Sequence, residues 1–128
     1  MSTEFVRLAH HASALAILAV MALGIVAPRL KSEALRAQLF PVEGMGGFGV
    51  VLFQVVSGAT LAGRAELPWG TPWIAGGIGG LVVALVLWGW AMARRSNGRT
   101  ADRAACVLNG LALLAVLVSY GLMMAKPT

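Results

Sequence analysis

Four long apolar runs occupy most of the chain, and short polar connections separate them. The runs cover residues 5–27, 45–63, 73–93 and 104–125, and each holds between 19 and 23 residues. An α-helix rises about 1.5 Å per residue, so each run can cross a hydrocarbon layer of about 30 Å. The runs do not alternate polar and apolar positions, which argues against barrel strands. The pattern predicts an all-α fold in which residues 1–128 form one four-transmembrane-helix bundle.

Composition agrees with a membrane domain. Hydrophobic residues make up 59% of the chain and charged residues 12%, with a formal net charge of +5. Soluble domains carry about 25% charged residues. The basic residues lie in the connections and form no stripe on a soluble face, so we expect contact with the lipid bilayer and none with nucleic acid.

The basic residues also predict an orientation. Seven of them lie in the first and third connections, which share one side of a four-span bundle: Arg29, Lys31, Arg36, Arg94, Arg95, Arg99 and Arg103. The positive-inside rule places this side in the cytoplasm and both termini outside. The first run resembles a cleaved signal peptide only loosely, and its length favours a retained span. The stretch 29–40 is expected to form a short amphipathic helix on the cytoplasmic surface.

The second and third apolar runs contain several glycines. Gly76 and Gly80 form a GxxxG pair, which lets helix backbones approach closely. We expect this pair to serve packing within the bundle. The alternative is a dimer face on the third helix.

Two adjacent histidines, His10 and His11, are the only ionisable side chains well inside a predicted span. Ionisable residues in membrane spans are functional candidates. Neighbouring helical residues point about 100° apart, so the two rings cannot both face one ligand. We expect His10 to face the bundle, because it shares its helix face with Ser13 and Ala14. In the plainer alternative, both histidines lie near the interface and contact water.

The last predicted helix ends at the same membrane depth as the two histidines, and it carries thioether and hydroxyl side chains there. These are Tyr120, Met123 and Met124, and the second helix adds Ser57 and Thr60 at the same level. Imidazole and thioether groups suit copper(I) or haem iron. The candidate metal ligands are therefore His10, His11 and Met123, and the wider candidate cofactor site adds Met124 and Tyr120. Methionine is also an ordinary apolar filler.

Other polar residues are expected to serve structure. Gln54 and Asn109 lie deeper and are expected to hydrogen-bond across helices. The acidic residues are expected at helix ends or in loops, which argues against a proton-coupled transporter: Glu4, Glu33, Glu43, Glu66 and Asp102. The sequence contains no Ser–His–Asp set, P-loop or HExxH motif, so an enzyme is not expected.

Several short motifs resemble a known family. They are RLAHH (7–11), PRL (28–30), SGATLA (57–62) and GLMMAKP (121–127). In this order they resemble the small four-helix membrane proteins related to the CopD copper-resistance family, with HemJ-type proteins as more distant relatives. The resemblance implies a bacterial inner-membrane protein that handles copper or haem, with His10 or His11 as the early-helix histidine.

Two functional hypotheses follow. In the first, a layer of histidine and methionine at the outer face binds copper or haem. In the second, the chain is a non-catalytic accessory subunit of a larger membrane complex, or pairs as a homodimer, and its helices serve as a surface for that partner.

Overall fold

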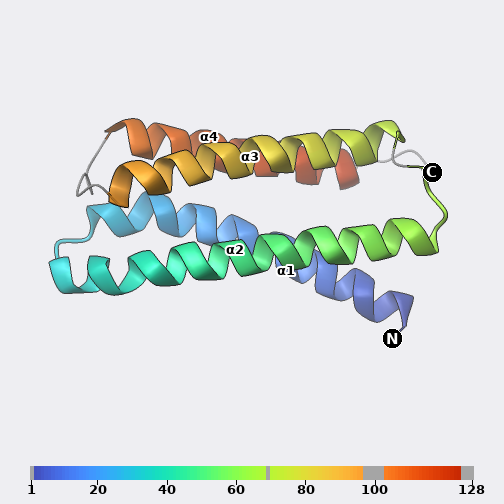
Figure 1. Cartoon of the computed structure of the whole chain (residues 1–128), viewed down its shortest axis with the longest axis horizontal. Helices are drawn as coiled ribbons and strands as arrows, with labels where there is room; N and C mark the ends of the chain where they lie inside the picture. The colour runs from blue at the N-terminus through green and yellow to red at the C-terminus, as the bar shows by residue number, and fades with distance from the viewer. Residues whose placement is uncertain (1, 69, 97–102, 125–128) are drawn as a thin grey trace.

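The fold is a bundle of four long α-helices (Figure 1). The computed structural model describes residues 2–68, 70–96 and 103–124. The helices are α1 (Thr3–Val26), α2 (Glu33–Arg64), α3 (Pro72–Ser96) and α4 (Arg103–Met124), and a short 3-10 turn, η1 (Ala27–Arg29), follows α1. All four are long and apolar enough to cross a membrane, and the described residues include no strand. The predicted all-α, four-helix fold is confirmed. Several residues named above lie outside the described parts of the chain: Arg99, Asp102, Lys126 and Pro127.

Serine caps begin the first two helices. The Ser2 hydroxyl accepts the backbone N–H of Phe5 at 3.2 Å, and Ser32 accepts that of Leu35 at the same distance. Each cap satisfies an N–H that has no partner inside the helix. Ser32 therefore marks where the chain re-enters helix after the turn at Pro28.

The helices form two antiparallel hairpins, α1–α2 and α3–α4, with α1 packed against both α2 and α4 (Figure 1). α1 begins and α4 finishes at one end of the bundle, which we call the termini end. The opposite end, the basic end, holds all but two of the described Lys and Arg residues: Arg29, Lys31, Arg36, Arg94, Arg95 and Arg103. The first and third connections therefore share one end, as the span count predicts.

The core contains buried residues of all four helices, and α1, α2 and α3 meet in it at Gly47. Ile17, Met21, Val51 and Trp88 are among its buried side chains. Gly47 of α2 makes this junction tight, because a Cβ there would lie 2.8 Å from Cζ2 of Trp88 and 3.0 Å from Cγ1 of Val20. A side chain at position 47 would push against both neighbouring helices.

Glycines of α3 face α4. A Cβ on Gly76 would lie 3.0 Å from Leu122, and a Cβ on Gly80 would overlap the hydroxyl of Ser119. The prediction that the Gly76–Gly80 pair serves packing within the bundle is confirmed. Gly79 lies on the other face, where an added Cβ would have nothing within 4 Å.

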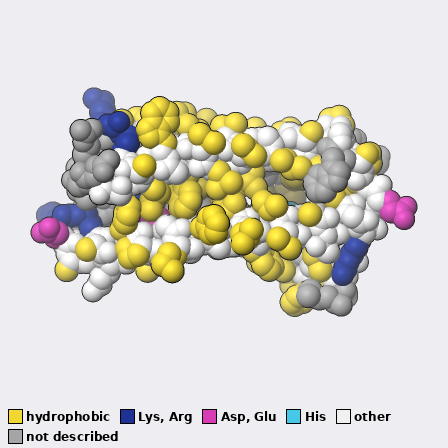
Figure 2. Space-filling view, viewed as in Figure 1, with side chains coloured by type: hydrophobic (Ala, Val, Ile, Leu, Met, Phe, Trp, Pro, Cys, Tyr) yellow, Lys and Arg dark blue, Asp and Glu magenta, His cyan; other side chains and the backbone are white. Residues whose placement is uncertain are grey.

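The outer surface is apolar along the length of the helices. Figure 2 shows hydrophobic side chains across the middle of the molecule and charged side chains gathered at its two ends. Many large hydrophobic residues are exposed, among them Leu8, Phe48 and Val86. This distribution is what lipid contact between two polar interfaces requires.

The connection at the basic end is shorter than predicted. The sequence predicts a surface helix over 29–40 and a loop up to Gly44, but α2 begins at Glu33 and continues through Pro41. A proline lacks only one N–H donor and one helical bond, so a helix supported by its neighbours can contain it. Arg94 and Arg95, also expected in a loop, belong to the last turn of α3. These shifts carry Glu43 and Arg95 into the bundle.

Candidate functional site

One interhelical polar network lies toward the termini end and joins α1 to α2. We call it the histidine network; its members are His10, Ser13, Gln54 and Ser57. Nδ1 of His10 lies 2.7 Å from Oγ of Ser57, and Nε2 lies 3.2 Å from Nε2 of Gln54. The hydroxyl of Ser13 donates to the side-chain oxygen of Gln54. Gln54 therefore bonds across helices as predicted.

Hydrogen-bond directions in the histidine network assign the tautomer of His10. The side-chain oxygen of Gln54 accepts from Ser13, which turns the amide nitrogen of Gln54 toward Nε2 of His10. An amide nitrogen can only donate, so this orientation assigns the lone pair to Nε2 and the proton to Nδ1, which donates to the Ser57 hydroxyl. The lone pair that would bind a metal is thus held on the nitrogen facing Gln54.

Gly58 makes room for the imidazole. A Cβ at this position would lie 3.0 Å from Cε1 of His10, so the ring packs directly on the helix backbone of α2. His10 is half-buried, whereas His11 is exposed. The ring centroids lie 6.3 Å apart and the planes are inclined by 62°. The expectation that His10 faces the bundle is confirmed.

The other predicted members of the layer lie on α4 and α2. Met123 packs against Gly77 of α3, and Met124 is exposed. Tyr120 is half-buried. The Thr60 hydroxyl donates to the carbonyl of Val56 in its own helix at 2.9 Å. The structure therefore places His10 against α2 and Met123 against α3.

These contacts limit the kind of metal centre that the site can hold. Among the described residues no group of three or more His, Cys, Asp or Glu side chains is placed to hold a metal ion. His10 is the one imidazole that is held between two helices in the described part of the chain, and its Nε2 faces Gln54.

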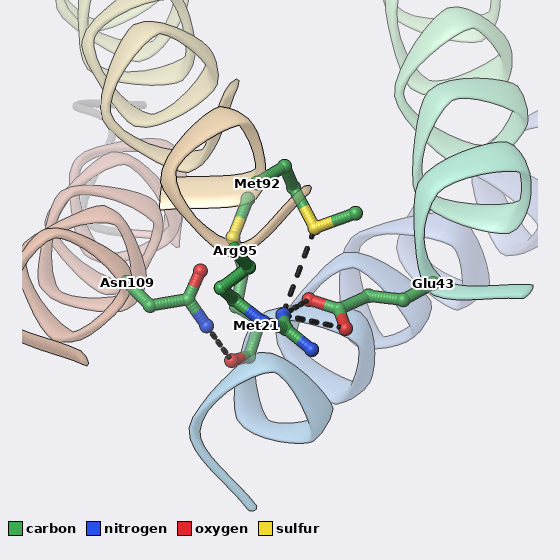
Figure 3. Close-up of polar contacts among 5 residues, drawn as sticks. All are labelled: Met21, Glu43, Met92, Arg95 and Asn109. Atoms are coloured by element: carbon green, nitrogen blue, oxygen red, sulfur yellow. Dashed lines mark hydrogen bonds and ion pairs between the residues drawn. The ribbon is translucent and has the colours of Figure 1, made fainter. Parts of the chain in front are cut away.

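A second polar cluster lies toward the basic end and was not predicted. We call it the ion-pair cluster; its members are Glu43, Arg95 and Asn109. Nη1 of Arg95 donates to both carboxylate oxygens of Glu43, at 2.7 and 2.8 Å (Figure 3). The Glu43 side chain is fully buried and that of Arg95 is 5% exposed. The expectation that every carboxylate lies at a helix end or in a loop is wrong for Glu43, and the argument against proton-coupled transport loses that support.

Asn109 of α4 brings α1 into the same cluster. Its side-chain N–H donates to the backbone carbonyl of Met21 at 2.9 Å (Figure 3). A Cβ on Gly24 would lie 2.6 Å from a carboxylate oxygen of Glu43 and would overlap the amide of Asn109. The missing side chain of Gly24 therefore leaves the room that the Glu43 carboxylate and the Asn109 amide occupy. The predicted interhelical bond of Asn109 is confirmed.

The remaining contacts of Arg95 are weaker. Its guanidinium carbon lies 5.3 Å from the ring centroid of Phe40, and Nη1 lies 3.7 Å from the sulfur of Met92. Nε of Arg95 and Oδ1 of Asn109 are buried and have no hydrogen-bond partner among the described residues. In the described part of the chain, the Arg95 charge is stabilised chiefly by the Glu43 carboxylate and the face of Phe40.

An apolar layer separates the two polar groups. Gln54 and Glu43 are 11 residues apart on α2, or about 16 Å along the axis. The core residues Ile17, Val51 and Trp88 lie between them. The histidine network and the ion-pair cluster are therefore separate sites on the same helices.

Comparison with known proteins adds no relationship. No family model, no curated protein and no solved structure matches the chain.

Proposed function

We propose that this protein binds a metal centre through Nε2 of His10, with haem iron as the first candidate and copper(I) as the second. The observation that carries the proposal is the placement of the His10 ring between Ser57 and Gln54. Ser57 accepts the Nδ1–H at 2.7 Å, which leaves the lone pair on Nε2. Metal-ligating histidines in proteins typically donate the other ring N–H to such a partner.

Ligand binding requires one local change. The amide of Gln54 now donates to Nε2 and would have to turn away. The bond is 3.2 Å long between neutral groups, which is a modest contact. The imidazole itself stays in place, because Ser57 and the Gly58 backbone hold it independently of Gln54.

The placement of Met123 ranks the two candidates. A haem iron accepts one imidazole as its proximal ligand. A copper(I) site needs further soft ligands, and the thioether of Met123 packs on Gly77 of the other hairpin. Copper binding would therefore require α4 to move or a second copy of the chain to supply the sulfur.

An optical and metal analysis tests the proposal. We expect protein purified from haem-supplied cells to show a Soret band that His10→Ala abolishes and His11→Ala retains, because only His10 is held between helices. His11→Ala is the matched control, because both histidines lie on α1 and differ in burial. Copper bound under reducing conditions, lost with the same variant and without a Soret band, would assign copper(I). A Soret band or copper content unchanged in His10→Ala would refute the proposed ligand.

The proposed location is a bacterial inner membrane with both termini periplasmic. Four helices of membrane-spanning length support the membrane location. The basic residues gathered at one end support an orientation with that end in the cytoplasm. The resemblance to CopD-related proteins supports the bacterial assignment.

A second candidate function is that of an accessory subunit in a membrane complex. Gly46 and Gly49 favour it, because they are exposed on α2 and an added Cβ on either would meet nothing within 4 Å. Small residues on a lipid-facing surface allow another helix to approach closely. Crosslinking in membranes tests this surface: crosslinks from Gly46→Cys to another protein or to a second copy would support it. A chain that stays monomeric and uncrosslinked in the membrane would contradict it.

A further inference from the structure

Each of the two serine hydroxyls in the histidine network has two acceptors within hydrogen-bond distance. The Ser13 hydroxyl reaches the side-chain oxygen of Gln54 and the backbone carbonyl of His10, the latter at 2.8 Å. The Ser57 hydroxyl reaches the backbone carbonyl of Gln54 at 3.2 Å and Nδ1 of His10 at 2.7 Å. A hydroxyl has one proton and turns to suit its partners, so either serine can change acceptor while its oxygen stays in place.

The side-chain amide of Gln54 connects the two serines through His10. Its oxygen faces Ser13, and its nitrogen faces Nε2 of His10, 3.2 Å away. An amide group has nearly the same shape after a half-turn, which exchanges its oxygen and its nitrogen. After a half-turn the Gln54 oxygen faces Nε2 and can only accept, so the ring proton must lie on Nε2 and the lone pair on Nδ1.

Both orientations of the Gln54 amide satisfy the network. In the orientation that the structure shows, Ser13 donates to Gln54, and the amide donates to Nε2 of His10. The Nδ1–H then donates to Ser57, whose own proton goes to the backbone carbonyl of Gln54. After the half-turn these bonds reverse: Ser57 donates to Nδ1, Nε2–H donates to the amide, and the amide donates to Ser13, whose proton goes to the His10 carbonyl. An unpaired buried polar group is costly, and neither orientation creates one within this network.

We propose that the Gln54 amide is a switch that opens or closes His10 to a ligand. This role rests on the proposed function, in which Nε2 of His10 is the ligating atom. A metal binds a ring nitrogen through its lone pair, so only the orientation with the lone pair on Nε2 accepts one. After the half-turn the lone pair lies on Nδ1, where the buried Ser57 covers it. Gln54 is therefore a positioning residue, which acts on the ligand through the ring proton of His10.

Exchange between the two orientations moves one proton and leaves the charge of the network unchanged. With water as the proton carrier, Nε2 gains a proton as Nδ1 loses one, and the reverse step restores the first orientation. The ligand binds only the open orientation, so the apparent affinity falls in proportion to the fraction of molecules that hold it. A side chain at position 54 that only accepts hydrogen bonds should therefore hold the site closed.

NMR of nitrogen-labelled histidine in the metal-free protein tests the switch without any ligand. The chain has two histidines, so a His11→Ala background leaves His10 as the one that is observed. Protonated and unprotonated ring nitrogens differ in chemical shift, and we expect the signals of both tautomers of His10. Gln54→Glu presents only acceptor oxygens and should keep Nε2 protonated. Gln54→Leu is the control, because it neither donates nor accepts and should not fix the proton on Nε2.

Haem binding in the same background separates the switch from the proposed function. Gln54→Leu should keep the Soret band and Gln54→Glu should lose it, because only the second variant keeps the proton on Nε2. Two tautomers without a Soret band in any of these proteins would support the switch and refute haem as the ligand. A single tautomer in the metal-free parent, or a Soret band that survives in Gln54→Glu, would overturn the switch.

Discussion

Nη1 of Arg95 lies within 2.8 Å of both carboxylate oxygens of Glu43, and this contact joins the two hairpins at the basic end. Glu43 belongs to α2 and Arg95 to α3. Both side chains are buried, so neither charge is solvated by water. A buried charge that loses its partner is far more costly than one that keeps it. The pair therefore makes the two hairpins depend on each other.

Removal of either partner should destabilise the bundle strongly. We expect Glu43→Gln or Arg95→Met to lower the free energy of unfolding by about 3–5 kcal/mol, because each leaves one buried charge uncompensated. Reversible unfolding in mixed micelles, followed by circular dichroism, measures the change. Arg7→Met is the control, since the exposed pair of Arg7 and Glu4 contributes little.

The double variant separates the cost of losing the ion pair from the cost of leaving one buried charge without its partner. Glu43→Gln with Arg95→Met removes both charges, and we expect it to be more stable than either single variant. The coupling free energy from this double-mutant cycle should be at least about 2 kcal/mol. Additive losses would show that the two charges do not stabilise each other.

Gly47 and Gly46 offer a matched pair for packing. An alanine at 47 would press on Trp88 and Val20, whereas an alanine at 46 would meet nothing within 4 Å. We expect Gly47→Ala to cost about 1–3 kcal/mol in unfolding free energy and Gly46→Ala to cost nothing. The same unfolding assay compares them. Equal effects would contradict the three-helix junction at Gly47.

Hydropathy predicted the four helices because membrane spans are defined by length and apolarity. The observed ends differ by a few residues for α1, α3 and α4. The exception is α2, which starts at Glu33 instead of near Met45. Pro41, Glu43 and Gly44 resemble a loop in sequence, yet Ser32 supplies a helix cap and Ala34 to Phe40 favour helix. That cap was the signal for a longer helix.

The ion-pair cluster could not be read from hydropathy, because hydropathy does not give the rotation of a helix about its axis. That rotation decides whether Glu43 faces lipid or Arg95. The inward direction of His10 is predictable from the sequence, because Ser13 and Ala14 mark the inward face of its own helix. The pairing of Met123 with Gly77, in contrast, depends on how α4 packs on α3, which the spacing of either helix leaves open.

Ser57 should stabilise the α1–α2 hairpin through His10. Ser57→Ala removes the acceptor of the Nδ1–H and should cost about 1 kcal/mol of unfolding free energy. Thr60→Ala is the control, because the Thr60 hydroxyl bonds within its own helix. If the two variants lose equal stability, the bond between His10 and Ser57 does not join the helices.

Single cysteines can test the proposed orientation. In a Cys106→Ala background, Ser2→Cys lies at the termini end and Lys31→Cys at the basic end, and both positions are exposed. We expect a membrane-impermeant maleimide added to spheroplasts to label Ser2→Cys, and to label Lys31→Cys only after lysis, because the basic end should remain in the cytoplasm. The Cys106→Ala parent should stay unlabelled throughout. The reverse order of labelling would place both termini in the cytoplasm and would put the His10 site on the cytoplasmic side of the membrane.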